Sequence, residues 1–169
     1  MEHWLESVYR DHAPALFRFL LRLTGNEADT HDALQEIFVR LARSPRMLDG
    51  VAAPRSFLFR MAHRLVIDRH RRDETRRQTA ERAAQEISAM VEPETTGSDA
   101  IWRRNSVAAA LEALPLEQKA VVALKVWENL TFAEIAEVLD IPANTAASRY
   151  RYALDKLRES LRLLHKDMP

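Results

Sequence analysis

The side chains best suited to binding a ligand by charge are arginines, and they cluster in one stretch. Between positions 55 and 77 there are eight arginines and three acids. A guanidinium is always charged and binds phosphate oxygens, so such a stretch suits a nucleic-acid backbone. Phe57 and Phe59 lie near its start, and bases of melted DNA stack on aromatic rings. A basic run at a helix end is also compatible with a solvated terminus that complements the helix dipole.

Patterns for catalysis or metal binding are absent from the sequence. The histidines show no HExxH or similar spacing, and no phosphate-binding loop or nucleophile motif occurs. The lack of cysteine excludes disulfides and zinc fingers and fits a reducing compartment. No segment resembles a signal peptide or a membrane-spanning helix. We therefore expect a cytoplasmic, non-enzymatic protein with no metal, no cofactor and no membrane insertion.

A helix-turn-helix pattern lies near the C-terminal end. Thr131 is a predicted N-cap that forms a capping box with Glu134, and this helix is expected to end near Asp140. The following helix is expected to be capped by Asn144 or Thr145. In a helix-turn-helix, the second helix enters the major groove of DNA. The same pattern also occurs as a plain helical hairpin in bundles that do not bind DNA.

The second helix of this motif has two distinct faces. Its predicted inner face comprises Ala146, Tyr150, Ala153, Leu157 and Leu161. Its predicted outer face comprises Ala147, Ser148, Arg151, Tyr152 and Asp155. Ser148 and Arg151 are candidates for contacts with base edges, whereas Arg149 and Lys156 are better placed for phosphates.

A separate amphipathic helix is predicted over residues 27–43. Its apolar stripe comprises Leu34, Ile37, Phe38 and Leu41. Its polar side comprises Asp32, Gln35, Glu36, Arg40 and Arg43. Acids in the first turns favour the positive end of the helix dipole. Such a helix is either an ordinary surface helix or a docking surface for a partner protein.

The whole pattern predicts an all-α fold of two small helical domains. The first domain, 1–77, is expected to contain helices over residues 5–24, 27–43 and 54–72, with Pro14 as a kink or break in the first. A polar stretch with proline and glycine, 78–100, is predicted to be a flexible linker. The second domain, 101–169, is expected to place two helices before the helix-turn-helix, over about 99–113 and 116–128. In the latter helix, over about 116–128, we expect Val121, Val122, Leu124, Val126 and Trp127 to be buried.

The net charge of zero counts mildly against DNA binding, but the charges are unevenly distributed.

Together these segments resemble the extracytoplasmic-function (ECF) sigma factors of bacterial RNA polymerase, group 4 of the sigma-70 family. The stretches that carry the resemblance read DALQEIFVRL, PRSFLFRMAHRLVIDRHRR and ALEALPLEQKAVVALKVWENLTFAEIAEVLDIP. The likeness extends from about Tyr9 to Leu164. It implies a chain that binds core RNA polymerase and promoter DNA and directs transcription initiation, while the polymerase performs the chemistry. It also implies a possible anti-sigma factor, because the family is commonly held inactive by one.

The resemblance assigns roles by position. Core polymerase binding is implied for Asp32, Gln35, Glu36 and Phe38, although Phe38 is expected to be mostly core. Contact with the −10 element, including a flipped base, is implied for the loop 44–54 and for Arg55, Ser56, Arg60, Arg64, Arg69, Arg71 and Arg72. Recognition of the −35 element is implied for Thr145, Ala147, Ser148, Arg149, Arg151 and Tyr152.

The sequence departs from the family pattern in the helix-turn-helix. Residues 144–149 read NTAASR where the family usually has GTVKSR, so Ala147 removes a basic contact with DNA. Tyr152 also stands where the family usually has arginine. These changes leave the −35 sequence open.

Two other interpretations compete with a sigma factor. One is a conventional helix-turn-helix regulator that binds duplex DNA by itself, which gives no reason for the basic stretch at 55–77. The other is a sigma-like adaptor that binds a regulator without DNA. Ala147 favours the adaptor, and the arginines argue against it.

Overall fold

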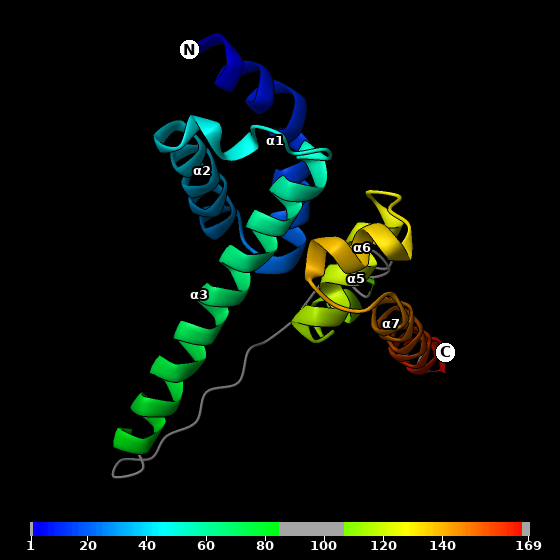
Figure 1. The fold of residues 1–169 in the computed structure, drawn as a ribbon. Helices are drawn as coiled ribbons and strands as arrows, with labels where there is room; N and C mark the ends of the chain where they lie inside the picture. Colours follow the sequence, from blue (N-terminus) through cyan, green and yellow to red (C-terminus); the bar gives the residue numbers. More distant parts are fainter. Residues whose placement is uncertain (1, 85–106, 167–169) are drawn as a thin grey trace.

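The computed structural model describes residues 2–84 and 107–166, and every regular element in these two stretches is helical (Figure 1). The prediction of an all-α fold with two small helical domains is confirmed. The first group comprises α1 (Glu2–Thr24), α2 (Glu27–Arg43), the short 3-10 helix η1 (Pro45–Leu48) and α3 (Pro54–Ala84). Pro14 lies inside α1, and the helix continues through it to its predicted end.

The turn between α1 and α2 is built by local chemistry. Gly25 adopts a φ of +75°, which a residue without Cβ accepts readily. The side-chain oxygen of Asn26 then accepts the amide of Asp29 at 2.8 Å, which caps α2. The buried Thr30 hydroxyl donates to the Asn26 carbonyl at 2.7 Å. This turn brings α2 back against α1, and the two helices pack along their apolar stripes.

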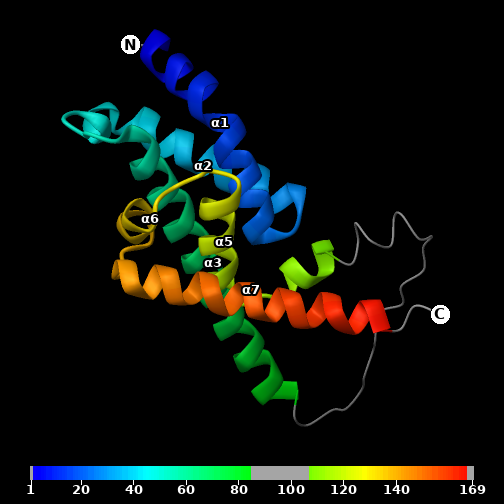
Figure 2. The same ribbon diagram turned by 90° about the vertical axis from the view of Figure 1, so that its right-hand side faces the viewer.

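Helix α3 completes the first domain and extends well beyond it. Leu58, Ala62 and Leu65 are buried, and the ring of Phe59 meets that of Phe19 edge-on at 5.2 Å. The prediction that Phe59 is available for stacking on bases is therefore wrong, because its ring belongs to the core. The C-terminal half of α3 projects away from the other helices (Figures 1 and 2).

The predicted linker overlaps this helix. Helix α3 runs to Ala84, past the predicted helix end at 72, because no glycine or proline interrupts the polar sequence there. Residues 85–100 of the predicted linker lie outside the described residues. The domain boundaries at 77 and 101 stay a prediction.

The second group follows with residues 107–112, which are helical, then α5 (Leu116–Val126), α6 (Phe132–Leu139) and α7 (Ala143–Lys166). The predicted capping box is present: the Thr131 hydroxyl accepts the Glu134 amide, and the Glu134 carboxylate accepts the Thr131 amide at 2.7 Å. Asp140 ends α6 in the left-handed conformation with φ of 56°.

The predicted cap of the second helix is wrong. Asn144 and Thr145 lie inside α7, and the amide of Thr145 donates to the carbonyl of Pro142 at 2.9 Å. The φ of proline is already close to the helical value, so the chain enters the helix directly after it. The two residues are therefore not available as caps.

In the second domain, some residues that were predicted to be buried are exposed near the ends of α5 and α7. Ala146 and Ala153 are fully buried as expected, but Leu161 is exposed. Val126 and Trp127, predicted to be buried, are 52% and 42% exposed. Both follow the buried run of α5 that ends at Leu124, where the helix emerges from the core.

The two groups of helices are packed against each other. Helix α1 contacts α5, and α3 contacts α6, so segments far apart in the sequence lie side by side (Figures 1 and 2). Most of their buried apolar side chains form one cluster that includes Phe19 and Leu58 from the first group and Val121 and Ile135 from the second, while Leu114, Val122 and Ala153 form a smaller separate cluster. The arrangement brings α6 alongside the arginine-bearing part of α3.

Candidate nucleic-acid and partner interfaces

The polar side of α2 offers a mixed surface of charge and apolar groups. Asp32 and Gln35 are exposed, whereas Phe38 is 8% exposed and packs against Tyr9 with ring centroids 4.8 Å apart. The structure thus places Phe38 mostly in the core, as expected. Between α1 and α2 lies a groove of about 440 Å³ lined by Leu5, Tyr9, His31, Leu34, Gln35, Phe38, Val39 and Ala42. Tyr9 and Val39 are exposed apolar side chains at this groove. Tyr9 lies on the apolar stripe that the sequence predicts for the first helix, and the sequence did not single out Val39.

Glu36 is held within the first domain. Its carboxylate forms ion pairs with Arg40, one turn further along α2, and with Arg69 of α3 at 3.0 Å. Partial burial would raise the pKa of Glu36, but the hydrogen bonds from Arg69 and Arg40 outweigh it and lower that pKa. Glu36 therefore ties α2 to α3 and is less available to a partner than Asp32.

The predicted arginine strip divides into separate faces of α3. Arg69 points to α2, where it contacts Glu36 and donates to the carbonyl of Asp29 at 3.3 Å. Arg71 and Arg72 are exposed and form no ion pair with any described residue. A straight helix turns 100° per residue, so Arg69 and Arg71, two positions apart, point to nearly opposite sides of α3. The structure does not bring all the predicted −10 arginines together.

The arginines nearer the start of α3 face the second domain. Arg55 donates to the Glu128 carboxylate at 2.8 Å and to the carbonyl of the same residue at 3.3 Å. Arg64 lies 3.6 Å from the Asp140 carboxylate. Ser56 and Arg60 are half-buried, and the Nε of Arg60 is buried without a partner among the described residues. These contacts were not predicted, because a pairing across 73 positions leaves no periodic signal in the sequence.

Helix α7 presents two of the predicted −35 residues to solvent. Arg151 and Tyr152 are exposed, and the guanidinium carbon of Arg151 lies 5.3 Å from the centre of the Tyr152 ring. Thr145 and Ala147 are half-buried. Ser148 is also half-buried, and its hydroxyl donates to the carbonyl of Thr145 at 3.0 Å. Arg151 and Tyr152 are therefore the most accessible members of the set.

Arg149 was expected to contact a DNA phosphate, but in the structure it forms an ion pair within the protein. It is mostly buried and pairs with Glu117 of α5 at 2.7 Å, an ion pair within the second domain. The nearby His63 of α3 is half-buried, and this partial burial together with the positive charges of Arg149 and Arg64 lowers the pKa of His63 to about 4. His63 is therefore neutral at pH 7.

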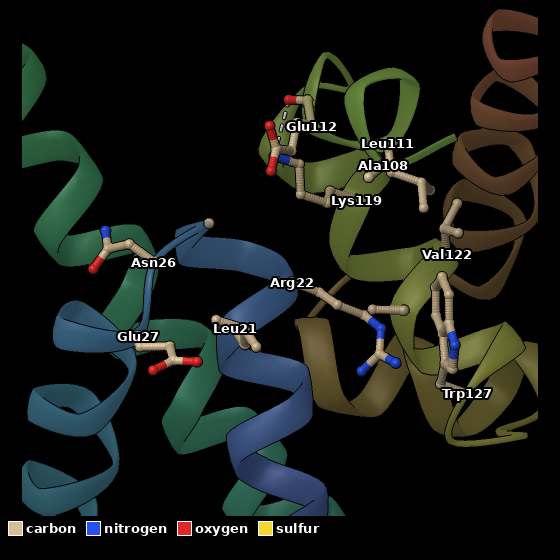
Figure 3. Close-up of a pocket in the computed structure, with 12 residues that line it drawn as sticks. Leu21, Arg22, Asn26, Glu27, Ala108, Leu111, Glu112, Lys119, Val122 and Trp127 are labelled. Carbon is tan, nitrogen blue, oxygen red and sulfur yellow. Dashed lines mark hydrogen bonds between the residues drawn. The ribbon is translucent and has the colours of Figure 1, made fainter. Parts of the chain in front are cut away.

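A pocket of about 420 Å³ lies between the two groups of helices (Figure 3). Leu21 and Arg22 of α1 line one side, and Leu111, Val122 and Trp127 line the other. The guanidinium carbon of Arg22 sits 4.1 Å from the centre of the Trp127 ring. Burial lowers the pKa of Arg22, with the charge of Glu128 opposing that effect. The partly exposed Trp127 thus contributes to the contact between domains.

Comparison with known proteins identifies the family. The profile of Sigma-70 region 2 matches residues 8–77, and that of Sigma-70 region 4 matches residues 104–157. The ECF RNA polymerase sigma factor SigL of Mycobacterium tuberculosis is 31% identical over 95% of this chain and 90% of its own length. The chain belongs to the ECF sigma factors. It is an RNA polymerase sigma factor that acts in promoter recognition and transcription initiation.

A further relative is named an ECF sigma factor, and two solved structures share the fold. SigX of Bacillus subtilis is 24% identical to this sigma factor over 99% of this chain and 89% of its own length. The fold also matches CnrH, solved with the cytosolic domain of CnrY, with a TM-score of 0.69 at 20% identity over 99% of this chain and 92% of that one. RpoE of Bartonella quintana, solved with the anti-sigma factor NepR, gives a TM-score of 0.66 at 17% identity over 96% and 98%. In the described part of the sigma factor, no helix combines the length and apolar character needed to span a bilayer.

Proposed function

We propose that three helical surfaces divide the work of this sigma factor: α2 binds core polymerase, α3 holds the opened −10 strand, and α7 reads the −35 duplex. The observation that carries the proposal is the two-faced α7. Ala146 and Ala153 are fully buried on one side, while Arg151 and Tyr152 are exposed on the other. A recognition helix needs this arrangement, since one face anchors it and the other enters the major groove.

On α7, Arg151 is the residue best suited to read a base. Its guanidinium can donate two hydrogen bonds to the O6 and N7 of guanine. The adjacent Tyr152 ring lies 5.3 Å from the guanidinium carbon, within the range of a cation–π contact. Ser148 and Thr145 are partly withdrawn, so they support the helix start more than they read bases. Ala147 adds no charge, and a −35 complex would rely more heavily on Arg151.

On α3, the exposed Arg71 and Arg72 are available to phosphates of the −10 strand. The side chains of Arg55 and Arg64 are 47% and 63% exposed in spite of their ion pairs. Arg69 is committed to Glu36, so it acts by holding α2 and α3 together. Phe57, half-buried, is the remaining aromatic candidate near the start of the helix.

On α2, the proposed polymerase contact combines charge with apolar area. Asp32 and Gln35 supply the polar part, and the neighbouring groove with exposed Tyr9 and Val39 supplies the apolar part. Protein interfaces commonly place such an apolar centre within a polar rim. We place the protein in the cytoplasm with the polymerase, which performs the chemistry, so the sigma factor itself is not an enzyme.

An anti-sigma factor is a further proposed partner. The structural relatives CnrH and RpoE were solved with CnrY and the anti-sigma factor NepR, respectively. Shared fold over nearly the whole chain supports a comparable inhibitor here.

Runoff transcription tests the proposal. Core polymerase is assayed with and without the sigma factor on fragments of the genome that encodes it, and specific starts that depend on the protein are expected. Binding to core without any transcript would support the adaptor that has lost DNA contact. Binding to duplex DNA without binding to core would support the conventional regulator.

A further inference from the structure

In the described part of α7, Tyr152 is the most exposed large apolar side chain. It is 54% exposed, against 38% for Leu161, the other exposed apolar side chain of this size there. Aromatic side chains contribute to interfaces mainly through the large area that they bury. In the free chain about half of that area is in water, so the ring of Tyr152 is available to a partner outside the chain.

The ring of Tyr152 points away from the helix that anchors α7. Two positions earlier, Tyr150 packs against Phe132 of α6 with ring centroids 5.7 Å apart. A helix turns 100° per residue, so residues two positions apart point to nearly opposite sides. Tyr150 thus belongs to the anchoring face of α7, and Tyr152 lies on the face that is proposed to enter the major groove.

The polar side chains one turn to either side of Tyr152 are engaged within α7. The Ser148 hydroxyl donates to a backbone carbonyl of the preceding turn at 3.0 Å, and the Asp155 carboxylate lies 3.5 Å from the guanidinium of Arg158. Arg151 instead contacts the ring itself, with its guanidinium carbon 5.3 Å from the ring centre. This part of the surface therefore offers DNA an aromatic ring with a guanidinium beside it.

In the major groove, thymine differs from the other bases by an apolar group. Its C5-methyl projects into the groove, where the other bases present mainly hydrogen-bond donors and acceptors. An aromatic ring suits this methyl group, and a guanidinium suits the O6 and N7 of guanine. Because successive base pairs lie about 3.4 Å apart, two side chains that touch each other can reach neighbouring base pairs.

We propose that Tyr152 reads a thymine of the −35 element through its C5-methyl group, on the base pair next to the one that Arg151 contacts. The inference rests on the proposed roles of α7 and Arg151. It adds a preference that hydrogen bonds cannot supply, because a methyl group neither donates nor accepts one. A tyrosine can also bind a phosphate through its hydroxyl, and the experiment separates these two roles.

Deoxyuridine provides the test, because it pairs like thymidine and lacks the methyl group. The holoenzyme of sigma factor and core polymerase is bound to a labelled promoter fragment found by runoff transcription, in which each thymine of the −35 region is replaced in turn by uracil. At one position the wild type is expected to bind the uracil duplex about three- to fivefold more weakly, as the loss of one buried methyl group predicts.

Three variants assign this preference to the ring. Tyr152→Ala is expected to bind the thymine and uracil duplexes equally. Tyr152→Phe keeps the ring and is expected to keep the preference. The matched control, Leu161→Ala, removes another exposed apolar side chain of α7 and is also expected to keep it. Thermal unfolding checks that every variant is folded.

The contrary outcomes differ from one another. A wild type that distinguishes uracil at no position would overturn methyl reading, and a preference retained in Tyr152→Ala would assign the methyl contact to a different side chain. A loss of affinity in Tyr152→Phe as large as that in Tyr152→Ala would place the tyrosine hydroxyl on a phosphate. Unchanged binding after the whole −35 region is scrambled would refute the proposed role of α7 itself, and with it the reading of thymine.

Discussion

Acidification is expected to destabilise this sigma factor through one histidine. His63 of α3 is half-buried and lies near the guanidinium groups of Arg149 and Arg64, and these surroundings lower its pKa from 6.5 to about 4. Protonation would place a third positive charge beside the two arginines. The folded chain therefore resists a proton that the unfolded chain accepts.

The pH window follows from the two pKa values. Above pH 6.5 His63 is neutral in both states and contributes no pH dependence. Between pH 6.5 and about 4 only the unfolded chain binds the proton, so the free energy of unfolding falls as the pH falls. The complete shift corresponds to roughly 3 kcal/mol, of which about 1.4 kcal/mol is expressed at about pH 5.5. Such a loss is a sizeable part of the stability of a small protein.

Urea unfolding followed by circular dichroism between pH 7.5 and 5.5 measures this effect. The variant His63→Gln is expected to lose the part of the pH dependence that belongs to His63, because glutamine does not titrate in this range. Part of the pH dependence remains in this variant, because burial also lowers the pKa of His12. The matched control, His70→Gln, changes an exposed histidine on the same helix and is expected to retain the full pH dependence. An equal loss of stability on acidification in His63→Gln and the wild type would refute the reasoning.

Three further outcomes are expected. Replacing Arg151 with alanine should weaken binding to a −35 duplex by about 1–3 kcal/mol and relax the sequence preference, whereas Lys156→Ala should weaken binding to all duplexes alike. Fluorescence anisotropy on a panel of duplex sequences measures both effects, and an equal effect of Arg151→Ala on every sequence would contradict base reading. Combining Asp32→Ala with Gln35→Ala should reduce binding to core polymerase in a pull-down and leave the melting temperature unchanged, and undiminished binding would remove α2 from the polymerase interface. Thr131→Ala breaks the capping box and should lower the free energy of unfolding by about 1 kcal/mol, so an unaltered urea midpoint would show that the cap does not contribute.

Local features of the sequence were sufficient to predict most elements. The bounds of α2, the capping box at Thr131 and the end of α6 at Asp140 all follow from signals within a few residues. The errors lie where local signals are weak or ambiguous. Asn144 is a good cap by type, but Pro142 already starts the helix, and the uninterrupted polar sequence after residue 72 extends α3 to Ala84.

The sequence predicted the exposure of some candidate binding residues correctly and that of others wrongly, again because local signals are ambiguous. Arg151 and Tyr152 are exposed as the helical period of α7 implies, because the opposite face carries the small buried residues. Phe57 and Phe59 were noted as aromatics near the basic stretch that suit stacking on bases, yet Phe59 faces the core, because proximity to arginines in the sequence does not show which way a ring points. The roles of these residues in binding stay predictions.

The sequence by itself determined the helical fold, the helix-turn-helix and the resemblance to ECF sigma factors, because each depends on spacing within short segments. Only the tertiary structure decided which arginines are free. Arg69 is bound to Glu36, Arg55 to Glu128 and Arg64 to Asp140, while Arg71 and Arg72 have no charged partner among the described residues. The physical reason is that an ion pair depends on distance in space, and residues separated by many positions meet only when the packing of helices brings them within a few ångströms.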